Sequence, residues 1–162
     1  EKTDTQNVSV GVKMTDNSKF HFEARYPLRH TDSFGGTPFV HGGVLLALTE
    51  IALSKYDEVS EIPAHRDVLR MQSHSQVRYR SPLNWDDIAV VRLRCTNLSP
   101  GRLVFEARVD AASDGRVIAE FTHRYAYINI KTGRPETPED WHAIVEAILS
   151  YDDAVKIDND NA

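Results

Sequence analysis

The strongest constraint on the fold of this chain is a long apolar segment, HGGVLLALTEIALSKYDEV, which begins at His41. Its good helix formers and its lack of proline predict a helix of about four turns. Glu50 is its only charged residue before Lys55. A surface helix has one polar face, whereas this helix is apolar nearly all round, so we expect it to be buried. The rest of the chain must supply its apolar cover.

The segments around this helix alternate between apolar and polar residues, which is typical of strands. Strands are predicted over residues 19–30, 68–81, 89–98, 103–112 and 116–130. A second helix is predicted from Thr137-Pro138-Glu139, as cap and first turn, to about Tyr151. The expected fold is therefore α+β: a long central helix wrapped by a curved antiparallel sheet of five or six strands, plus a C-terminal helix.

Length and composition indicate one domain. The 162 residues divide into an N-terminal extension (1–17), the folded domain (18–152) and an acidic tail (153–162). A formal net charge of −5 argues against a nucleic-acid partner, and no stretch has the composition of a membrane span. Cys95 is the single cysteine, and residues 1–7 do not resemble a signal peptide. We therefore expect a cytoplasmic protein.

One side of the predicted central helix carries the chemistry. Gly43, Ala47, Glu50 and Ser54 fall within about 60° of each other at about 100° per residue. Small side chains leave space there, and a carboxylate within an apolar helix is unusual. Glu50 is thus a candidate catalytic base or nucleophile, with Ser54 beside it. The alternative is a structural glutamate that pairs with an arginine or caps a backbone group of the sheet.

Two further candidates precede the helix. His41, Gly42 and Gly43 open it, and its first N–H groups have no partner within the helix, so they can stabilise negative charge on a substrate oxygen. Asp32 is a second candidate carboxylate, with an ordinary turn residue as the alternative. The sequence contains no HExxH, no CxxC, no GxSxG and no dinucleotide fingerprint, so no metal site and no cofactor are predicted.

These segments resemble a known family. GTPFVHGGVLLALTEIA resembles the His-Gly-Gly signature of hotdog-fold acyl-CoA thioesterases, in which an acidic residue follows the histidine by nine positions, as Glu50 follows His41. Ser54 matches a hydroxyl residue of the branch similar to the Arthrobacter-type 4-hydroxybenzoyl-CoA thioesterase. VRYRSPLNWDD and AYINIKTGRPETPEDW resemble later parts of the superfamily. The resemblance covers about residues 18–141.

The chain departs from the family pattern before the helix. Gly35 occupies the position, six residues before the histidine, where this branch has an Asn or Gln that positions the thioester. Another branch, similar to the Pseudomonas-type enzyme, uses an Asp ahead of the helix, and Asp32 resembles that residue. Two carboxylates therefore compete for the catalytic role. Glu50 is favoured, because its neighbours on the helix leave room for substrate.

The resemblance implies hydrolysis of an acyl-CoA or acyl-carrier thioester to an acid and a thiol. The amides of Gly42 and Gly43 would hold the thioester oxygen, and Glu50 would activate water or attack directly. Coenzyme A would enter as part of the substrate. Apolar side chains expected at the acyl group are Phe34, Phe39 and Leu46, and arginines expected near CoA phosphates are Arg66, Arg70, Arg78 and Arg80.

The same resemblance allows two other functions and implies that copies of the chain associate. The fold also hosts hydratases and dehydratases of acyl thioesters, although the dehydratase histidine would fall at Gly36. A non-catalytic acyl-CoA-binding domain is the third possibility. Hotdog domains associate through their sheets, and a lone chain would leave a long strand edge unpaired. We therefore expect a homodimer or homotetramer.

Overall fold

The computed structural model describes residues 16–64 and 67–156. Most of the predicted N-terminal extension, Arg66 and the end of the acidic tail lie outside these residues, so the predicted domain boundaries stay a prediction. The elements run in the order β1 (Phe22–Pro27), η1 (His30–Asp32), α1 (Gly42–Ser60), β2 (Val68–Tyr79), β3 (Ile88–Ser99), β4 (Arg102–Ala111), β5 (Val117–Asn129), β6 (Arg134–Pro135), α2 (Trp141–Tyr151) and β7 (Val155–Lys156).

One sheet forms most of the molecule, with its long strands in the order β1-β3-β4-β5-β2. Every neighbouring pair along this path is antiparallel, and tight turns join β3 to β4 and β4 to β5. Positive φ angles at Gly101 (65°) and Gly115 (71°) explain why glycine occupies both turns. Strand β2 lies at one edge, so one long side of it has no partner strand among the described residues.

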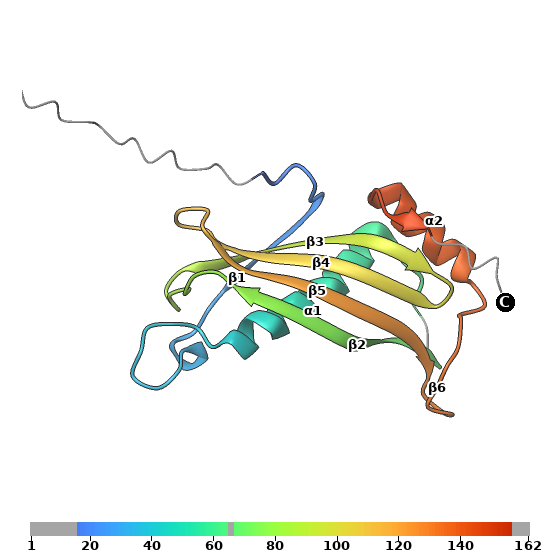
Figure 1. The fold of residues 1–162 in the computed structure, drawn as a ribbon, viewed down its shortest axis with the longest axis horizontal. Coiled ribbons are helices and arrows are strands. Elements are labelled where there is room, and N and C mark those ends of the chain that lie inside the picture. Colours follow the sequence, from blue (N-terminus) through green and yellow to red (C-terminus); the bar gives the residue numbers. More distant parts are fainter. Residues whose placement is uncertain (1–15, 65–66, 157–162) are drawn as a thin grey trace, which may run out of the picture.

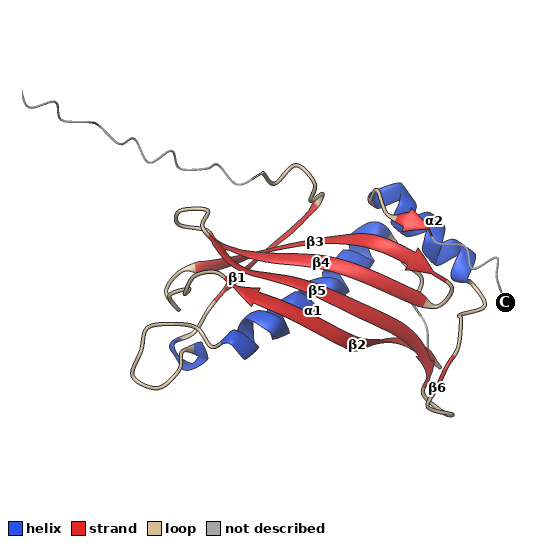
Figure 2. Cartoon of the chain, viewed as in Figure 1, coloured by secondary structure: helices blue, strands red, loops and turns tan. Residues whose placement is uncertain are grey.

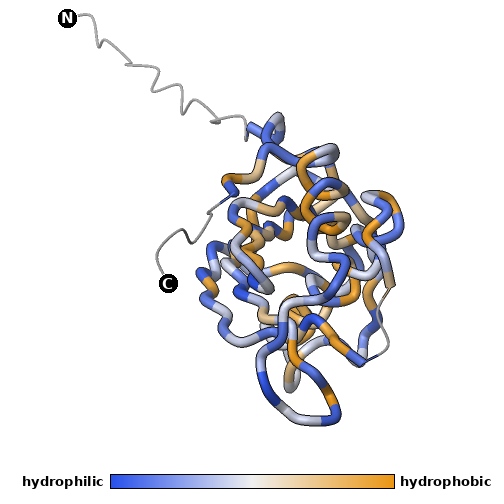
Figure 3. The backbone as a smooth tube through the Cα atoms, turned by 90° about the vertical axis from the view of Figure 1, so that its right-hand side faces the viewer, coloured by the Kyte–Doolittle hydropathy of each residue, from blue (hydrophilic) through white to orange (hydrophobic). Residues whose placement is uncertain are grey.

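Helix α1 crosses one face of the sheet, and α2 lies at one end of the molecule (Figures 1 and 2). The core fills the space between α1 and the sheet. It contains Leu45, Leu48, Ala52 and Tyr56 from the helix, packed against the apolar inner face of β3, β4 and β5. Hydrophobic and hydrophilic residues are interspersed along the backbone, as the colours in Figure 3 show, and buried and less buried positions alternate over parts of these strands. The alternation puts the apolar side chains on the helix side.

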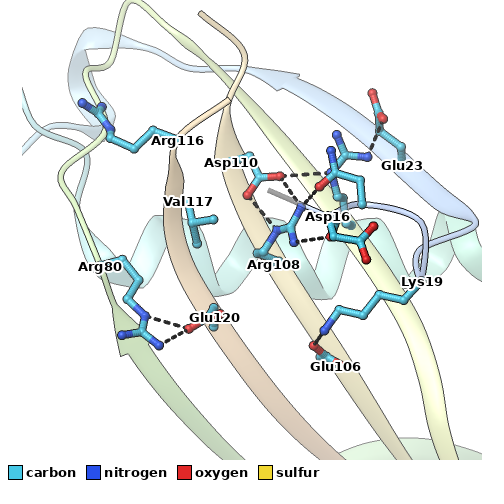
Figure 4. Close-up of polar contacts among 12 residues, drawn as sticks. Asp16, Lys19, Glu23, Arg80, Glu106, Arg108, Asp110, Arg116, Val117 and Glu120 are labelled. Carbon is cyan, nitrogen blue, oxygen red and sulfur yellow. Dashed lines mark hydrogen bonds and ion pairs between the residues drawn. The ribbon is translucent and has the colours of Figure 1, made fainter. Parts of the chain in front are cut away.

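The opposite face of the sheet carries charged side chains, many of them paired (Figure 4). Arg108 donates two hydrogen bonds to Asp110, and Arg92 donates to the same carboxylate at 3.0 Å. Arg108 and Asp110 are both buried, although this face is polar, because Asn17 and Phe20 lie over the arginine. Toward the other edge, Arg80 pairs with Glu120 in solvent.

A buried carboxylate fastens α2 to the rest of the domain. Asp152, which directly follows α2, accepts a hydrogen bond from the Tyr56 hydroxyl at 2.5 Å and one from the Cys95 N–H at 2.9 Å. All three residues are buried. Helix α1, strand β3 and the end of α2 therefore meet at one oxygen atom, Oδ2 of Asp152.

The α+β hotdog arrangement predicted from the sequence is confirmed, with differences in detail. The expected five or six strands are five long strands plus the two-residue strands β6 and β7, and β7 pairs with β3 in parallel. Helix α2 begins at Trp141 with Asp140 as its N-cap, not at Pro138. Helix α1 has 19 residues and is covered on one side only. None of the described helices has the length and apolarity that crossing a bilayer requires.

Candidate active site

The loop before α1 is closed at its base, which fixes where the helix begins. The His41 N–H donates to the Asp32 carbonyl at 2.9 Å, and the Val40 N–H donates to the Leu83 carbonyl at 2.8 Å. Among the described residues, none accepts a hydrogen bond from the N–H of Gly42 or Gly43. Two free amides at a helix N-terminus form a site for a negatively charged or polarised oxygen.

An apolar groove opens beside these amides. It has a volume of about 430 Å³, and its lining includes Phe34, Phe39, Gly42 and Tyr79. The Tyr79 side chain lies directly over Gly42, where an added Cβ would be only 2.7 Å from the Tyr79 hydroxyl oxygen. Glycine at position 42 therefore leaves room for Tyr79. Leu46, also expected at the acyl group, packs against the core instead.

Glu50 lies half-buried in the middle of α1, with its carboxylate held from the sheet. Its Oε1 atom accepts a hydrogen bond from the Tyr125 hydroxyl at 2.5 Å and another from Gln72 Nε2 at 2.6 Å. Gln72 in β2 and Tyr125 in β5 are directly opposite each other in the sheet register. The structural alternative of an arginine partner is therefore not observed, because both partners are neutral donors.

A buried histidine adjoins this carboxylate. His123 lies behind Gln72, with Nδ1 at 3.0 Å from Gln72 Nε2 and at 2.9 Å from the Ser75 hydroxyl. Its Nε2 is 2.8 Å from the Thr49 hydroxyl oxygen. Burial lowers the pKa of His123 to about 4, so the ring is neutral at physiological pH. His123 is thus a buried, neutral histidine whose contacts lead through Gln72 to Glu50.

The other predicted site residues lie in different surroundings. Asp32 caps its own short helix: its carboxylate accepts the Arg29 N–H at 2.7 Å and contacts the Arg29 guanidinium. Ser54 is exposed one turn after Glu50, and no described residue hydrogen-bonds to its hydroxyl. Gly35 lies at the exposed tip of the loop with nothing within 4 Å of its Cβ position. The structure thus brings Phe39 and Gly42 together but leaves Asp32 apart from Glu50.

The arginines expected near CoA phosphates are not equivalent. Arg70 forms a two-bond ion pair with Asp57, at 2.9 and 2.7 Å, between β2 and α1. Arg80 is exposed and paired with Glu120. Arg78 is exposed, and its guanidinium forms no hydrogen bond or ion pair with a described residue. Of these described arginines, Arg78 is the one whose guanidinium is available to a ligand.

Sequence reasoning missed Gln72, Tyr125 and Tyr79. One signal for Tyr125 was present: inward positions of β5 alternate from Phe121 through His123 to Tyr127, so a hydroxyl and an imidazole face the helix within an apolar row. Gln72 had no such signal, because the β-bulge between residues 72 and 74 changes the face of the strand. Among the described residues, no three His, Cys, Asp or Glu side chains are grouped to hold a metal ion.

A comparison with protein families identifies the segment that contains α1 and strands β2 to β4. The family model described as "Thioesterase superfamily" matches residues 37–118, from the loop before α1 to the start of β5. The chain belongs to the thioesterase superfamily. Its enzymatic class is therefore that of a thioester hydrolase. A search of the curated proteins found no significant match.

Solved structures with the same fold include several thioesterases. A hypothetical protein from Thermus thermophilus is 25% identical, with a TM-score of 0.69 over 80% of this chain and 98% of its own. A thioesterase from the same species, complexed with coenzyme A and Zn, is 24% identical, with a TM-score of 0.67 over 83% and 96%. A 1,4-dihydroxy-2-naphthoyl-CoA thioesterase from Synechocystis is 16% identical, with a TM-score of 0.68 over 79% and 95%.

Proposed function

We propose that this protein hydrolyses an acyl-CoA thioester, with Glu50 as its catalytic carboxylate, and that it belongs to the His-Gly-Gly branch of the superfamily. The proposal rests on the hydrogen bonds of the Glu50 carboxylate. Its Oε1 is held by two neutral donors, and no described residue bonds to Oε2. An oriented, unpaired carboxylate oxygen can take a proton from water or attack a carbonyl carbon.

The free amides of Gly42 and Gly43 form the oxyanion site in this proposal. As the tetrahedral intermediate forms, the thioester oxygen gains negative charge, which two N–H donors at a helix N-terminus stabilise. The C–S bond then breaks, the thiolate of CoA leaves and takes up a proton, and the acyl group leaves as the acid. The reaction consumes one water and needs no cofactor beyond the CoA of the substrate.

In this proposal, one site draws its amides and its carboxylate from two different chains. Glu50 follows Gly43 by seven residues and Gly42 by eight, so roughly 10–12 Å separate them along the helix axis. The free N–H groups also point away from the helix body, which puts a bound oxygen farther still from Glu50 of the same chain. A second α1 running antiparallel to the first brings the amides of one chain toward Glu50 of the other.

Two exposed surfaces support such a pair. On α1, the small residues Gly43 and Ala47 are exposed and allow another helix to approach closely. Ile51 is 55% exposed on the same side. Strand β2 has a free edge of 12 residues and carries the exposed side chains of Met71 and Tyr79. A homodimer that continues the sheet through β2 covers both surfaces and removes the unpaired edge.

The substrate occupies the groove beside Gly42 in this proposal. Its lining from Phe34, Phe39 and Tyr79 suits an apolar acyl group. Arg78 is the proposed contact for a CoA phosphate, because its guanidinium is unpaired among the described residues. Coenzyme A is favoured over a carrier protein as the thiol because CoA is bound in the related Thermus thermophilus thioesterase. The cytoplasmic location stays a prediction from the sequence.

Asp32 is the less favoured carboxylate because its oxygens already have partners. One oxygen accepts the Arg29 N–H and the other faces the Arg29 guanidinium. These contacts complete a local turn, which is a common structural role of aspartate. Removal of the Asp32 charge should therefore change catalysis less than removal of the Glu50 charge.

The test measures thiol release from hexanoyl-, palmitoyl- and benzoyl-CoA with a thiol reagent. We expect wild-type turnover on at least one substrate, loss of about 10³-fold or more in Glu50→Gln, and activity within about tenfold of wild type in Asp32→Asn. Full activity in Glu50→Gln refutes the role of Glu50. A change in enoyl absorbance without thiol release indicates a hydratase, and binding alone indicates a sensor domain.

A further inference from the structure

The two donors on Glu50 define which of its oxygens is reactive. Tyr125 Oη and Gln72 Nε2 both donate to Oε1, at 2.5 and 2.6 Å. Hydrogen bonds to an ionised acceptor are about twice as strong as neutral ones, so together they resist rotation of the carboxylate. Oε2 has no hydrogen-bond donor among the described residues. It is therefore the oxygen that is free to meet water or the thioester.

The orientation of the Gln72 amide is set by His123. The Thr49 hydroxyl donates its hydrogen to the Leu46 carbonyl at 2.7 Å, so its oxygen accepts from His123 Nε2. The neutral ring then carries its proton on Nε2 and presents Nδ1 as an acceptor. With Nδ1 and Glu50 Oε1 both accepting, only the NH₂ group of Gln72 fits between them; a flipped amide would place its oxygen against two acceptors.

Tyr125 is equally well held in its donor state. Its ring contacts the ring of Phe105 edge-on at 5.8 Å between centroids and the guanidinium of Arg70 at 5.6 Å. Burial, followed by the hydrogen bond to Glu50, raises the pKa of the Tyr125 hydroxyl well above its usual range. The hydroxyl therefore keeps its proton, and donates it to Glu50, at any pH at which the protein works.

We infer that Tyr125 and Gln72 are positioning residues for Glu50: they hold Oε1 so that Oε2 faces the thioester, and His123 fixes the amide that provides one of the two bonds. This inference rests on the proposed function. It adds three residues from β2 and β5 that touch no substrate and act only through the Glu50 carboxylate.

Two variants remove one donor each with little change in shape. Tyr125→Phe deletes the hydroxyl and keeps the ring, and Gln72→Met replaces the amide with an apolar chain of similar length. Each should lower kcat about 10- to 100-fold, the effect of one hydrogen bond to a charged group, and leave KM within about twofold.

Matched controls separate positioning from general damage. Tyr151→Phe removes a hydroxyl from a half-buried tyrosine on α2, and Glu146→Met replaces an exposed polar side chain of α2 with the same apolar side chain. Neither residue is part of the site, so both variants should retain wild-type kcat and KM. Unfolding midpoints of all four variants should lie within a few degrees of wild type.

Histidine variants test the acceptor at Nδ1. His123→Asn keeps a hydrogen-bond acceptor near the position of Nδ1, whereas His123→Leu removes it. We expect His123→Asn to retain more kcat than His123→Leu at equal unfolding midpoint, because only the leucine frees the Gln72 amide to turn. Equal kcat values in the two variants overturn the role of His123.

The outcomes distinguish this inference from the proposed function. If Glu50→Gln abolishes thiol release while Tyr125→Phe and Gln72→Met keep wild-type kcat, the positioning role is refuted and the proposed function stands. A loss of kcat that follows a lower unfolding midpoint, with KM changed as well, shows a merely structural role and also refutes it. Wild-type activity in Glu50→Gln overturns both.

Discussion

Replacement of Asp152 with alanine removes the acceptor that two buried donors share. The Tyr56 hydroxyl and the Cys95 N–H both bond to Asp152 Oδ2, at 2.5 and 2.9 Å, and neither donor has access to water in the folded protein. An unsatisfied buried donor costs about 1–3 kcal/mol, so the two together cost about 2–6 kcal/mol. Removal of a desolvated carboxylate offsets part of this, and we expect a net loss of about 2–4 kcal/mol.

Asparagine at the same position separates the hydrogen bonds from the charge. Asp152→Asn keeps an oxygen acceptor for both donors, so its free energy of unfolding at pH 7 should lie within about 1 kcal/mol of wild type. Burial raises the pKa of Asp152 above its ordinary value of 3.8. The protonated Asp152 carboxyl is therefore favoured more in the native state than in the unfolded state. Protonation of Asp152 thus contributes to the free energy of unfolding at low pH, and this contribution is lost as pH rises through the native pKa.

Urea denaturation followed by far-UV circular dichroism, at one protein concentration and over pH 3.5–8, measures these effects. Relative to Asp152→Asn, the wild-type protein should be most stable at the acidic end and lose this advantage as pH rises. An Asp152→Ala midpoint equal to wild type, at the same denaturant dependence, would show that the shared acceptor contributes little and would refute the reasoning.

Three further perturbations follow from contacts described above. Gly42→Ala places a Cβ 2.7 Å from the Tyr79 hydroxyl oxygen, so it should displace that ring and lower kcat on the order of tenfold or more, as steady-state thiol release will show. Ala47→Glu puts a charge on the proposed helix–helix contact and should give an inactive monomer in sedimentation velocity; an intact dimer would contradict the proposed pairing. Asp110→Ala leaves the buried Arg108 without its carboxylate partner, while Arg92 keeps Glu23, and should cost about 3–5 kcal/mol of unfolding free energy. Glu120→Ala, which breaks a solvent-exposed pair, should cost at most about 1 kcal/mol.

The sequence predicted the fold better than the environment of the site. Hydrophobic periodicity of two and of 3.6 reports which side chains face a core, and this sufficed for α1 and the five long strands. The prediction failed at the start of α2, which was based on cap residues: Pro138 and Glu139 look like a first turn, but the helix begins at Trp141. Cap preferences are local, and several adjacent polar residues satisfied them equally well.

For the site, helical spacing identified Glu50 but not its partners. Gln72 and Tyr125 are 53 residues apart in the sequence. They lie opposite each other only because β2 pairs with β5 in this register. No local sequence pattern predicts this pairing, and the β-bulge in β2 shifts the register by one residue. The burial predicted for α1 is incomplete in the structure, because no described residue covers the side of the helix that carries Gly43 and Ala47.

The loop before α1 is held by hydrogen bonds at its base, so its tip can be changed by mutation without moving the start of the helix. The bonds from His41 to Asp32 and from Val40 to Leu83 hold its base, while a Cβ added at Gly35 or Gly36, at the tip, would meet nothing within 4 Å. Residues inserted at the tip would lengthen one wall of the acyl groove without moving the helix amides that the base fixes. Substrate range and catalytic geometry are therefore separable, and libraries of loop length offer a route to new acyl selectivity.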